Sequence, residues 1–146
     1  MNKKGVTLIE LIVVFVIIAV MALLIAPNIS GWLPSYRLRS ATRDIVSTFR
    51  GAQIRAISEQ VSYTVSFNGA DTGATSNTAY IYPLGGTVTT LPPGITIVSN
   101  TLQNLRAVFN SDSTCNTAAA TIILQNTKGA QRMISIGSAT GKVTIQ

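Results

Sequence analysis

The residue best placed to do chemistry in this chain of 146 residues is Glu10, a single carboxylate inside an apolar block. Residues 11–25 carry only apolar side chains, and no charged residue occurs between Glu10 and Arg37. A run of about 20 apolar residues can cross a bilayer as a helix, and an acid within such a helix implies a partner for its charge. The position of Glu10 therefore predicts charge pairing rather than catalysis.

Other residue types that do chemistry are scarce. The chain has no histidine, which removes the usual general base and the usual neutral metal ligand. Cys115 is the only cysteine, so no intramolecular disulfide can form. Beyond Glu59 the only acids are Asp71 and Asp112, which are too few and too scattered for a metal site. The sequence predicts no enzymatic activity, no metal and no cofactor.

The composition is that of a protein that packs against copies of itself. Charged residues make up 11% of the chain and hydrophobic residues 47%, with much of the apolar excess near the N-terminus. The formal net charge is +6, to which Lys3 and Lys4 contribute. A chain of this length can form one domain with a modest core in addition to a membrane segment.

The N-terminal segment Lys3-Lys4-Gly5-Val6-Thr7-Leu8-Ile9-Glu10 resembles the class III signal of type IV prepilins and pseudopilins. That signal consists of a short basic leader, a glycine, an aromatic or aliphatic residue and then Thr-Leu-Ile-Glu. The resemblance implies that a prepilin peptidase removes a leader of residues 1–5 by cutting between Gly5 and Val6. It also implies N-methylation of the new terminus on Val6, where the family usually has Phe. A plain signal-anchor helix is the alternative reading of the same segment.

The resemblance gives Glu10 a partner. Cleavage after Gly5 creates a free α-amine on Val6, and an α-amine has a reference pKa near 8, so it is cationic at neutral pH. A carboxylate meeting this amine between staggered helices would remove two lone charges from lipid and set the register of a filament. Glu10 is therefore predicted to be an assembly residue. The alternative is an acid that reaches the membrane surface without a role.

Residues 6–34 are predicted to form a transmembrane and filament-core helix, bent or interrupted by Pro27 and Pro34. The family resemblance adds Pro27 to the assembly residues, because pilin-like helices often carry a proline at this depth. Trp32 and Tyr36 are placed either as a membrane-surface aromatic belt or as packing residues on the following domain. The flanking charges do not decide the topology, and the resemblance implies a cytoplasmic N-terminus and a periplasmic C-terminal domain in the bacterial inner membrane.

Residues 35–146 are predicted to form that pilin-like domain, with a helix over 36–60 and a β-sheet over 61–146. The helix should bury one stripe at helical spacing: Leu38, Ala41, Ile45, Phe49, Ala52 and Ala56. Strands are expected at 61–67, 79–84, 95–98, 106–109, 121–124, 133–136 and 142–145, with a loop over 69–78 and a hairpin turn at 126–129. The predicted fold class is α+β, a long N-terminal helix packed on an antiparallel sheet.

The body of the chain is similar to the GspH/FimT group of minor pseudopilins and minor pilins. The similarity lies in Ala52-Gln53-Ile54-Arg55-Ala56-Ile57, Leu91-Pro92-Pro93-Gly94-Ile95-Thr96-Ile97 and Thr140-Gly141-Lys142-Val143. It implies a minor subunit of a type IV pilus or of a type II secretion pseudopilus. The implied partners are other pilin or pseudopilin subunits, prepilin peptidase, the inner-membrane assembly platform and membrane lipid.

Two alternative functions stay open. Some FimT-like proteins bind DNA through a C-terminal Gly-Arg-x-Arg motif, of which Gly141-Lys142-Val143-Thr144 keeps the first basic position. Lys128, Arg132 and Lys142 could form a small DNA-binding patch, although solvated surface charge is the simpler reading. The other alternative is a major filament subunit, which shares the same signal.

Overall fold

The computed structural model describes residues 5–25, 29–74, 77–117, 119–137 and 140–146, and side-chain exposures are described outside 24–30. The chain divides into two compact units between Leu33 and Pro34. Each unit is described by itself.

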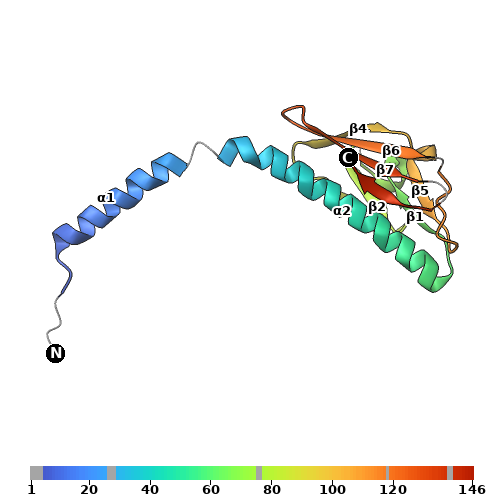
Figure 1. The fold of residues 1–146 in the computed structure, drawn as a ribbon, viewed down its shortest axis with the longest axis horizontal. Coiled ribbons are helices and arrows are strands. Elements are labelled where there is room, and N and C mark those ends of the chain that lie inside the picture. Colours follow the sequence, from blue (N-terminus) through green and yellow to red (C-terminus); the bar gives the residue numbers. More distant parts are fainter. Residues whose placement is uncertain (1–4, 26–28, 75–76, 118, 138–139) are drawn as a thin grey trace. The chain divides into compact units, whose positions relative to one another are not determined.

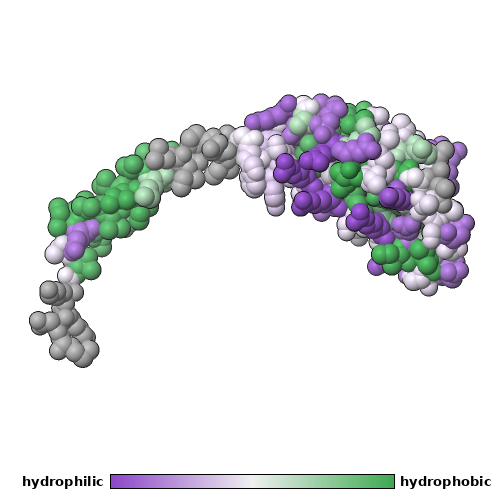
Figure 2. All heavy atoms as spheres, in the orientation of Figure 1, coloured by the Kyte–Doolittle hydropathy of each residue, from purple (hydrophilic) through white to green (hydrophobic). Residues whose placement is uncertain are grey.

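The first unit contains α1 (Leu8–Ile25), which is apolar around its whole circumference apart from Glu10. Figure 2 shows the apolar residues covering this helix. The sequence predicts a membrane-spanning helix over residues 6–34. Within the part of the chain that the structure describes, no helix is both long enough and apolar enough to cross a membrane. Pro27, the expected break and assembly residue, lies outside the described residues.

The second helix, α2 (Ile29–Glu59), continues through Pro34, where the sequence predicts a bend or gap. A proline inside a helix removes one backbone hydrogen bond, and the loss of that single bond leaves the helical path intact here. The helix ends at Glu59, and the next residue, Gln60, has a left-handed φ of 55° and a side-chain amide that donates to the Ile57 carbonyl at 2.8 Å. The predicted helix over 36–60 is thus confirmed, with an earlier start.

The inward stripe of α2 is confirmed residue by residue. All six predicted positions are buried: Leu38, Ala41, Ile45, Phe49, Ala52 and Ala56. They share one hydrophobic core with residues of the strands. Within that core the Phe49 ring lies 6.0 Å from the Phe67 ring. Figure 1 shows α2 running along the β-strands that complete the core.

The strands form two four-stranded antiparallel sheets, where the sequence predicts one sheet. The first has the order β3-β2-β1-β5, built from β1 (Tyr63–Ser66), β2 (Ala79–Tyr82), β3 (Thr87–Thr90) and β5 (Arg106–Phe109). The second has the order β4-β6-β7-β8, built from β4 (Ile95–Asn100), β6 (Ala120–Asn126), β7 (Gln131–Ile136) and β8 (Val143–Ile145). The α+β class is confirmed, and the number of sheets is corrected.

Three local elements differ from the predictions. Strand β3 was not expected, because all four of its side chains are exposed and three of them are threonines, so it lacks apolar alternation. The predicted loop over 69–78 contains a short helix, α3 (Gly69–Thr72), whose N-cap residue Asn68 accepts a bond from the Ala70 amide. A second short element, η2 (Gln103–Leu105), precedes β5.

The predicted hairpin turn at 126–129 is confirmed between β6 and β7. The Gly129 amide donates to the Asn126 carbonyl at 3.0 Å, and the Asn126 side chain accepts from the Lys128 and Ala130 amides. Gly129 has a φ of 80°, a conformation that glycine adopts without steric cost.

Candidate functional site

Thr7 is the N-cap of α1, and it exchanges hydrogen bonds with Glu10. The Glu10 amide donates to the Thr7 hydroxyl oxygen at 3.3 Å, while the Thr7 amide and hydroxyl donate to Glu10 Oε2 at 3.1 Å and 3.0 Å. This reciprocal arrangement is a capping box, which satisfies amide groups that the first turn of a helix leaves unpaired. Oε2 accepts both side-chain bonds described for Glu10, and Oε1 accepts none of them.

The carboxylate also borders a small hollow on α1. Ile9, Val13 and Val14 complete the lining, and the cavity volume is about 230 Å³. Apart from Glu10 the lining is apolar, and in apolar surroundings a charge pair is stronger than in water. A cationic group entering this hollow would therefore meet the carboxylate under favourable conditions.

The proposed cleavage point lies just ahead of the capping box. Gly5 and Val6 are exposed and are not part of a helix or strand, and Val6 is 76% exposed. The predicted leader residues before Gly5 lie outside the described residues. The Gly5–Val6 bond thus lies in an exposed segment outside any helix or strand, where a peptide bond is accessible to a peptidase.

The capping box adds Thr7 to the functional residues, a role that the sequence reasoning missed. The signal was present, because Thr-x-x-Glu directly before an apolar run is the capping-box pattern. The charge of Glu10 predicts a partner on a neighbouring chain, whereas its spacing from Thr7 accounts for the local hydrogen bonds.

The three cations proposed for DNA binding occupy separate places. Arg132 on β7 borders a hollow against α2, whereas Lys142 borders another hollow on the second sheet. Lys128 lies in the β6–β7 turn. The DNA-binding role of these residues stays a prediction.

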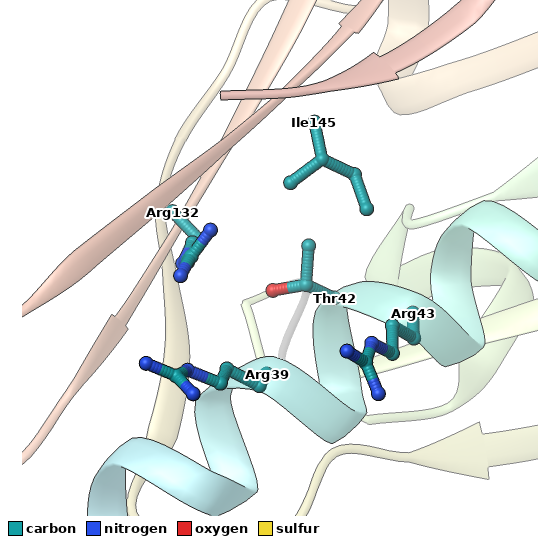
Figure 3. Close-up of a pocket in the computed structure, with 5 residues that line it drawn as sticks. All are labelled: Arg39, Thr42, Arg43, Arg132 and Ile145. Carbon is teal, nitrogen blue, oxygen red and sulfur yellow. The ribbon is translucent and has the colours of Figure 1, made fainter.

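Arg132 instead lies with two arginines from α2. The hollow, which we name the arginine groove, is bordered by Arg39, Thr42, Arg43, Arg132 and Ile145, with a cavity volume of about 510 Å³ (Figure 3). Arg39 and Arg43 are exposed and stand one turn apart on α2, and Arg132 is half-buried on β7. The sequence shows that Arg39 and Arg43 share a helix face, but only the fold brings Arg132 to them.

The acids of the second unit are mostly engaged elsewhere. Asp71 accepts two bonds from the Arg106 guanidinium, at 2.7 Å to Nε and 2.5 Å to a terminal nitrogen, and one from the Ser66 hydroxyl. Arg106 first, and then Ser66, lower the pKa of Asp71 below its ordinary value. Glu59 accepts a bond from the Tyr63 hydroxyl at 2.5 Å, which raises the pKa of Tyr63. The Thr114 hydroxyl and amide donate to Asp112 and lower its pKa.

The described side chains do not assemble a metal centre: among them, no group of three or more histidines, cysteines, aspartates or glutamates could hold a metal ion. Cys115 is buried, with its Sγ 3.1 Å from the Thr117 hydroxyl. The described side chains can recognise charged groups. The Glu10 carboxylate on α1 can bind a cation, and the guanidinium groups of the arginine groove can bind an anion.

Comparison with known proteins supports the reading of the N-terminus. A family model described as the prokaryotic N-terminal methylation motif matches residues 1–26. No curated protein and no solved structure matches the chain significantly. The motif supports a type IV pilin-like subunit, a structural rather than an enzymatic kind of protein that is membrane-anchored or incorporated in a pilus. It implies processing by prepilin peptidase and assembly with other pilins.

Proposed function

We propose that this chain is a minor pilin or pseudopilin, a subunit that joins the base or tip of a type IV pilus or of a type II secretion pseudopilus. The observation that carries the proposal is the methylation motif over residues 1–26, with Glu10 set in an otherwise apolar helix. The work of such a subunit is mechanical. Apolar helices pack in the core of the filament, and the sheet-bearing unit faces outward and selects its neighbours.

The precursor is held in the bacterial inner membrane by its apolar N-terminal segment, with the C-terminal domain in the periplasm. Prepilin peptidase cuts between Gly5 and Val6, and the new terminus on Val6 is methylated. This order places proteolysis before assembly, because only the cleaved chain carries the amine that Glu10 needs.

Glu10 then has two separable roles. Its Oε2 stays bonded to Thr7 and caps α1. Its Oε1 accepts none of the described side-chain bonds, so it is the oxygen we assign to the Val6 amine of a neighbouring subunit. A charged group in apolar surroundings without a partner is costly, so subunits that bring the two charges together are favoured over other registers.

The test separates the charge of Glu10 from its cap. Glu10→Ala removes both, whereas Glu10→Gln removes the charge and keeps a side chain that completes a capping box. Both variants should insert into the membrane like the unaltered chain but enter sheared filaments in much lower amounts. Glu59→Ala, which removes another exposed acid, is the matched control and should be incorporated normally.

Normal incorporation of Glu10→Gln would contradict the charge-pairing role. Mass spectrometry of the mature protein addresses the processing step independently. We expect an N-terminal peptide that starts at a methylated Val6, and a mature chain that still carries Lys3 and Lys4 would contradict the whole assignment. Quantifying the subunit in sheared filaments distinguishes a minor from a major component, because a major subunit would dominate them.

A further inference from the structure

The arginine groove concentrates positive charge that no ion pair among the described residues neutralises. Among the described residues no carboxylate lies within ion-pairing distance of Arg39, Arg43 or Arg132, and the ion pair found joins Arg106 to Asp71. Arg37, by contrast, donates to the Pro93 carbonyl at 3.1 Å. Three guanidinium groups of like charge gathered around one hollow repel each other, so an anion that enters it is attracted by all of them.

The second unit has little acid to offer such a groove. Asp71, Glu59 and Asp112 hold the hydrogen bonds described above. Asp44 borders a neighbouring hollow with Arg39 and Arg43, of about 290 Å³, without forming an ion pair. Asp71, Glu59 and Asp112 of a second copy would be engaged in the same way, so a different anionic molecule suits the groove better than a second copy does.

We propose that Arg39, Arg43 and Arg132 form a binding site for the phosphate group of a small organic phosphate or of an anionic lipid headgroup. A carboxylate has two oxygens and is satisfied by one bidentate arginine. A phosphate monoester carries three terminal oxygens and up to two negative charges near neutral pH, which suits three guanidinium groups, whereas a lipid phosphodiester carries two terminal oxygens and one charge. The number of arginines therefore favours phosphate over an acidic side chain.

The rest of the lining indicates that the phosphate is attached to an organic group. The cavity volume of about 510 Å³ lies within the usual range of small-molecule sites and is more than a bare phosphate needs. Ile145, which is 41% exposed, supplies an apolar wall opposite the charged side chains. Figure 3 shows the Ile145 side chain directed toward Thr42, which lies between Arg39 and Arg43 on α2.

The backbone around the groove is held firmly, so the site is partly organised before a ligand arrives. Arg132 lies in the paired part of β7, opposite Leu124 of β6. The buried Thr42 hydroxyl donates to the Leu38 carbonyl at 2.7 Å, which fixes its orientation on α2. Binding thus requires ordering of three side chains but no rearrangement of the fold.

A lipid headgroup is one of the two sources, and Tyr36 is relevant to it. Tyr36 is 53% exposed and borders the hollow next to the arginine groove. Tyrosine is enriched where proteins meet the headgroup region of a membrane. A small soluble phosphate ester would use the same guanidinium groups without a membrane.

The experiment uses the full chain in micelles of a neutral detergent at pH 7, so it does not depend on cleavage or filament assembly. The thermal unfolding midpoint is followed with inorganic phosphate, with glycerol 3-phosphate, and with phosphatidylglycerol or phosphatidylcholine mixed into the micelle. Each soluble anion is compared with chloride at equal ionic strength. A ligand that binds only the folded chain raises the midpoint, so stabilisation reports binding.

We expect at least one phosphate probe to raise the midpoint of the unaltered chain. Arg39→Gln and Arg132→Gln should each weaken binding roughly tenfold to a hundredfold, the usual loss for a charge-assisted contact. Arg132→Lys keeps the charge without the bidentate geometry and should give an intermediate loss. Arg50→Gln removes an equal charge from an exposed position of α2 that does not border the groove, and it should bind normally.

Comparison of the probes identifies the source of the phosphate. Stabilisation by glycerol 3-phosphate in a neutral micelle indicates a soluble ester, and stabilisation by phosphatidylglycerol alone indicates a lipid headgroup. The proposal is overturned if no phosphate probe exceeds chloride and phosphatidylglycerol does not exceed phosphatidylcholine. It is also overturned if Arg50→Gln weakens binding as much as Arg132→Gln does. Duplex DNA is added as a further probe, and the proposal fails if DNA binds through Arg132 more tightly than every phosphate probe.

Discussion

The aromatic ring of Phe49 on α2 lies 5.7 Å from the ring of Phe109 on β5, and the two planes are inclined by 51°. Both residues are fully buried. This contact joins the helix to the last strand of the first sheet in the order β3-β2-β1-β5. Because the Phe67 ring also lies 6.0 Å from the Phe49 ring, Phe49 is a central contact between the helix and the strand-bearing part of the core.

Replacing Phe49 with alanine should therefore destabilise the C-terminal unit strongly. Truncation of a buried phenylalanine removes its transfer free energy and leaves a cavity, at a cost of about 3–5 kcal/mol. Ile54→Ala on the same helix is the control, because Ile54 is 66% exposed and its loss should change stability by about 0.5 kcal/mol or less. Urea denaturation of the full chain in micelles measures both, and equal effects would contradict the assigned core.

Two glycines should respond in opposite directions to alanine. Gly141 has a φ of 56°, and an added Cβ would lie 2.8 Å from the Ser113 carbonyl oxygen, so Gly141→Ala should destabilise by about 1–3 kcal/mol. Gly51 lies inside α2, where an added Cβ meets no atom within 4 Å. Gly51→Ala should stabilise by about 0.5–1 kcal/mol, because alanine favours the helix. The denaturation midpoints of the two variants show whether each substitution lowers or raises the stability as expected.

The ion pair of Asp71 with Arg106 should give the stability a dependence on acid pH. Arg106 lowers the pKa of Asp71 in the folded state. The contribution is therefore complete above the unfolded pKa of about 4 and is lost as the pH falls through the lower folded value. Asp71→Asn should lower the unfolding midpoint at pH 7, and its difference from the unaltered chain should shrink in acid.

Asp112 provides the comparison for this pH effect. Its pKa is also lowered, by hydrogen bonds from Thr114 rather than by an ion pair. Asp112→Asn should remove part of the dependence of stability on acid pH, and its effect on stability should change little with salt concentration. The contribution of Asp71 to stability should instead weaken as salt screens the two charges. A pH-independent difference for Asp71→Asn would contradict the assigned origin.

The capping box makes a prediction for Thr7 that differs from the one for Glu10. Thr7→Val removes the hydroxyl that accepts from the Glu10 amide, and loss of an N-cap typically costs about 1 kcal/mol. Hydrogen exchange of the first amides of α1 in micelles should accelerate roughly fivefold. Thr7→Ser retains the hydroxyl and should leave the exchange unchanged. Because Thr7→Val keeps the Glu10 charge, it should enter filaments far better than Glu10→Gln does.

Much of the fold followed from residue periodicity. The buried stripe of α2 obeys the 3.6-residue repeat, and the β6–β7 turn has the residues that such a turn requires. The division into two sheets could not be read in the same way, because alternation tells which residues face a core but not which strands pair. Strand β3 was missed because its exposed side chains leave no apolar pattern, and only its pairing with β2 makes it a strand.

The sequence by itself determined the match of residues 1–26 to the prokaryotic N-terminal methylation motif, because that motif is a contiguous pattern that depends on the types and offsets of neighbouring residues. It determined the helix face that becomes the core for the same reason. Only the tertiary structure decided which distant charges act together. Arg132 reaches Arg39 and Arg43 because β7 is folded beside α2, and no local spacing encodes that approach. Asp71 is likewise assigned to Arg106 by the fold, which makes it unavailable to the arginine groove.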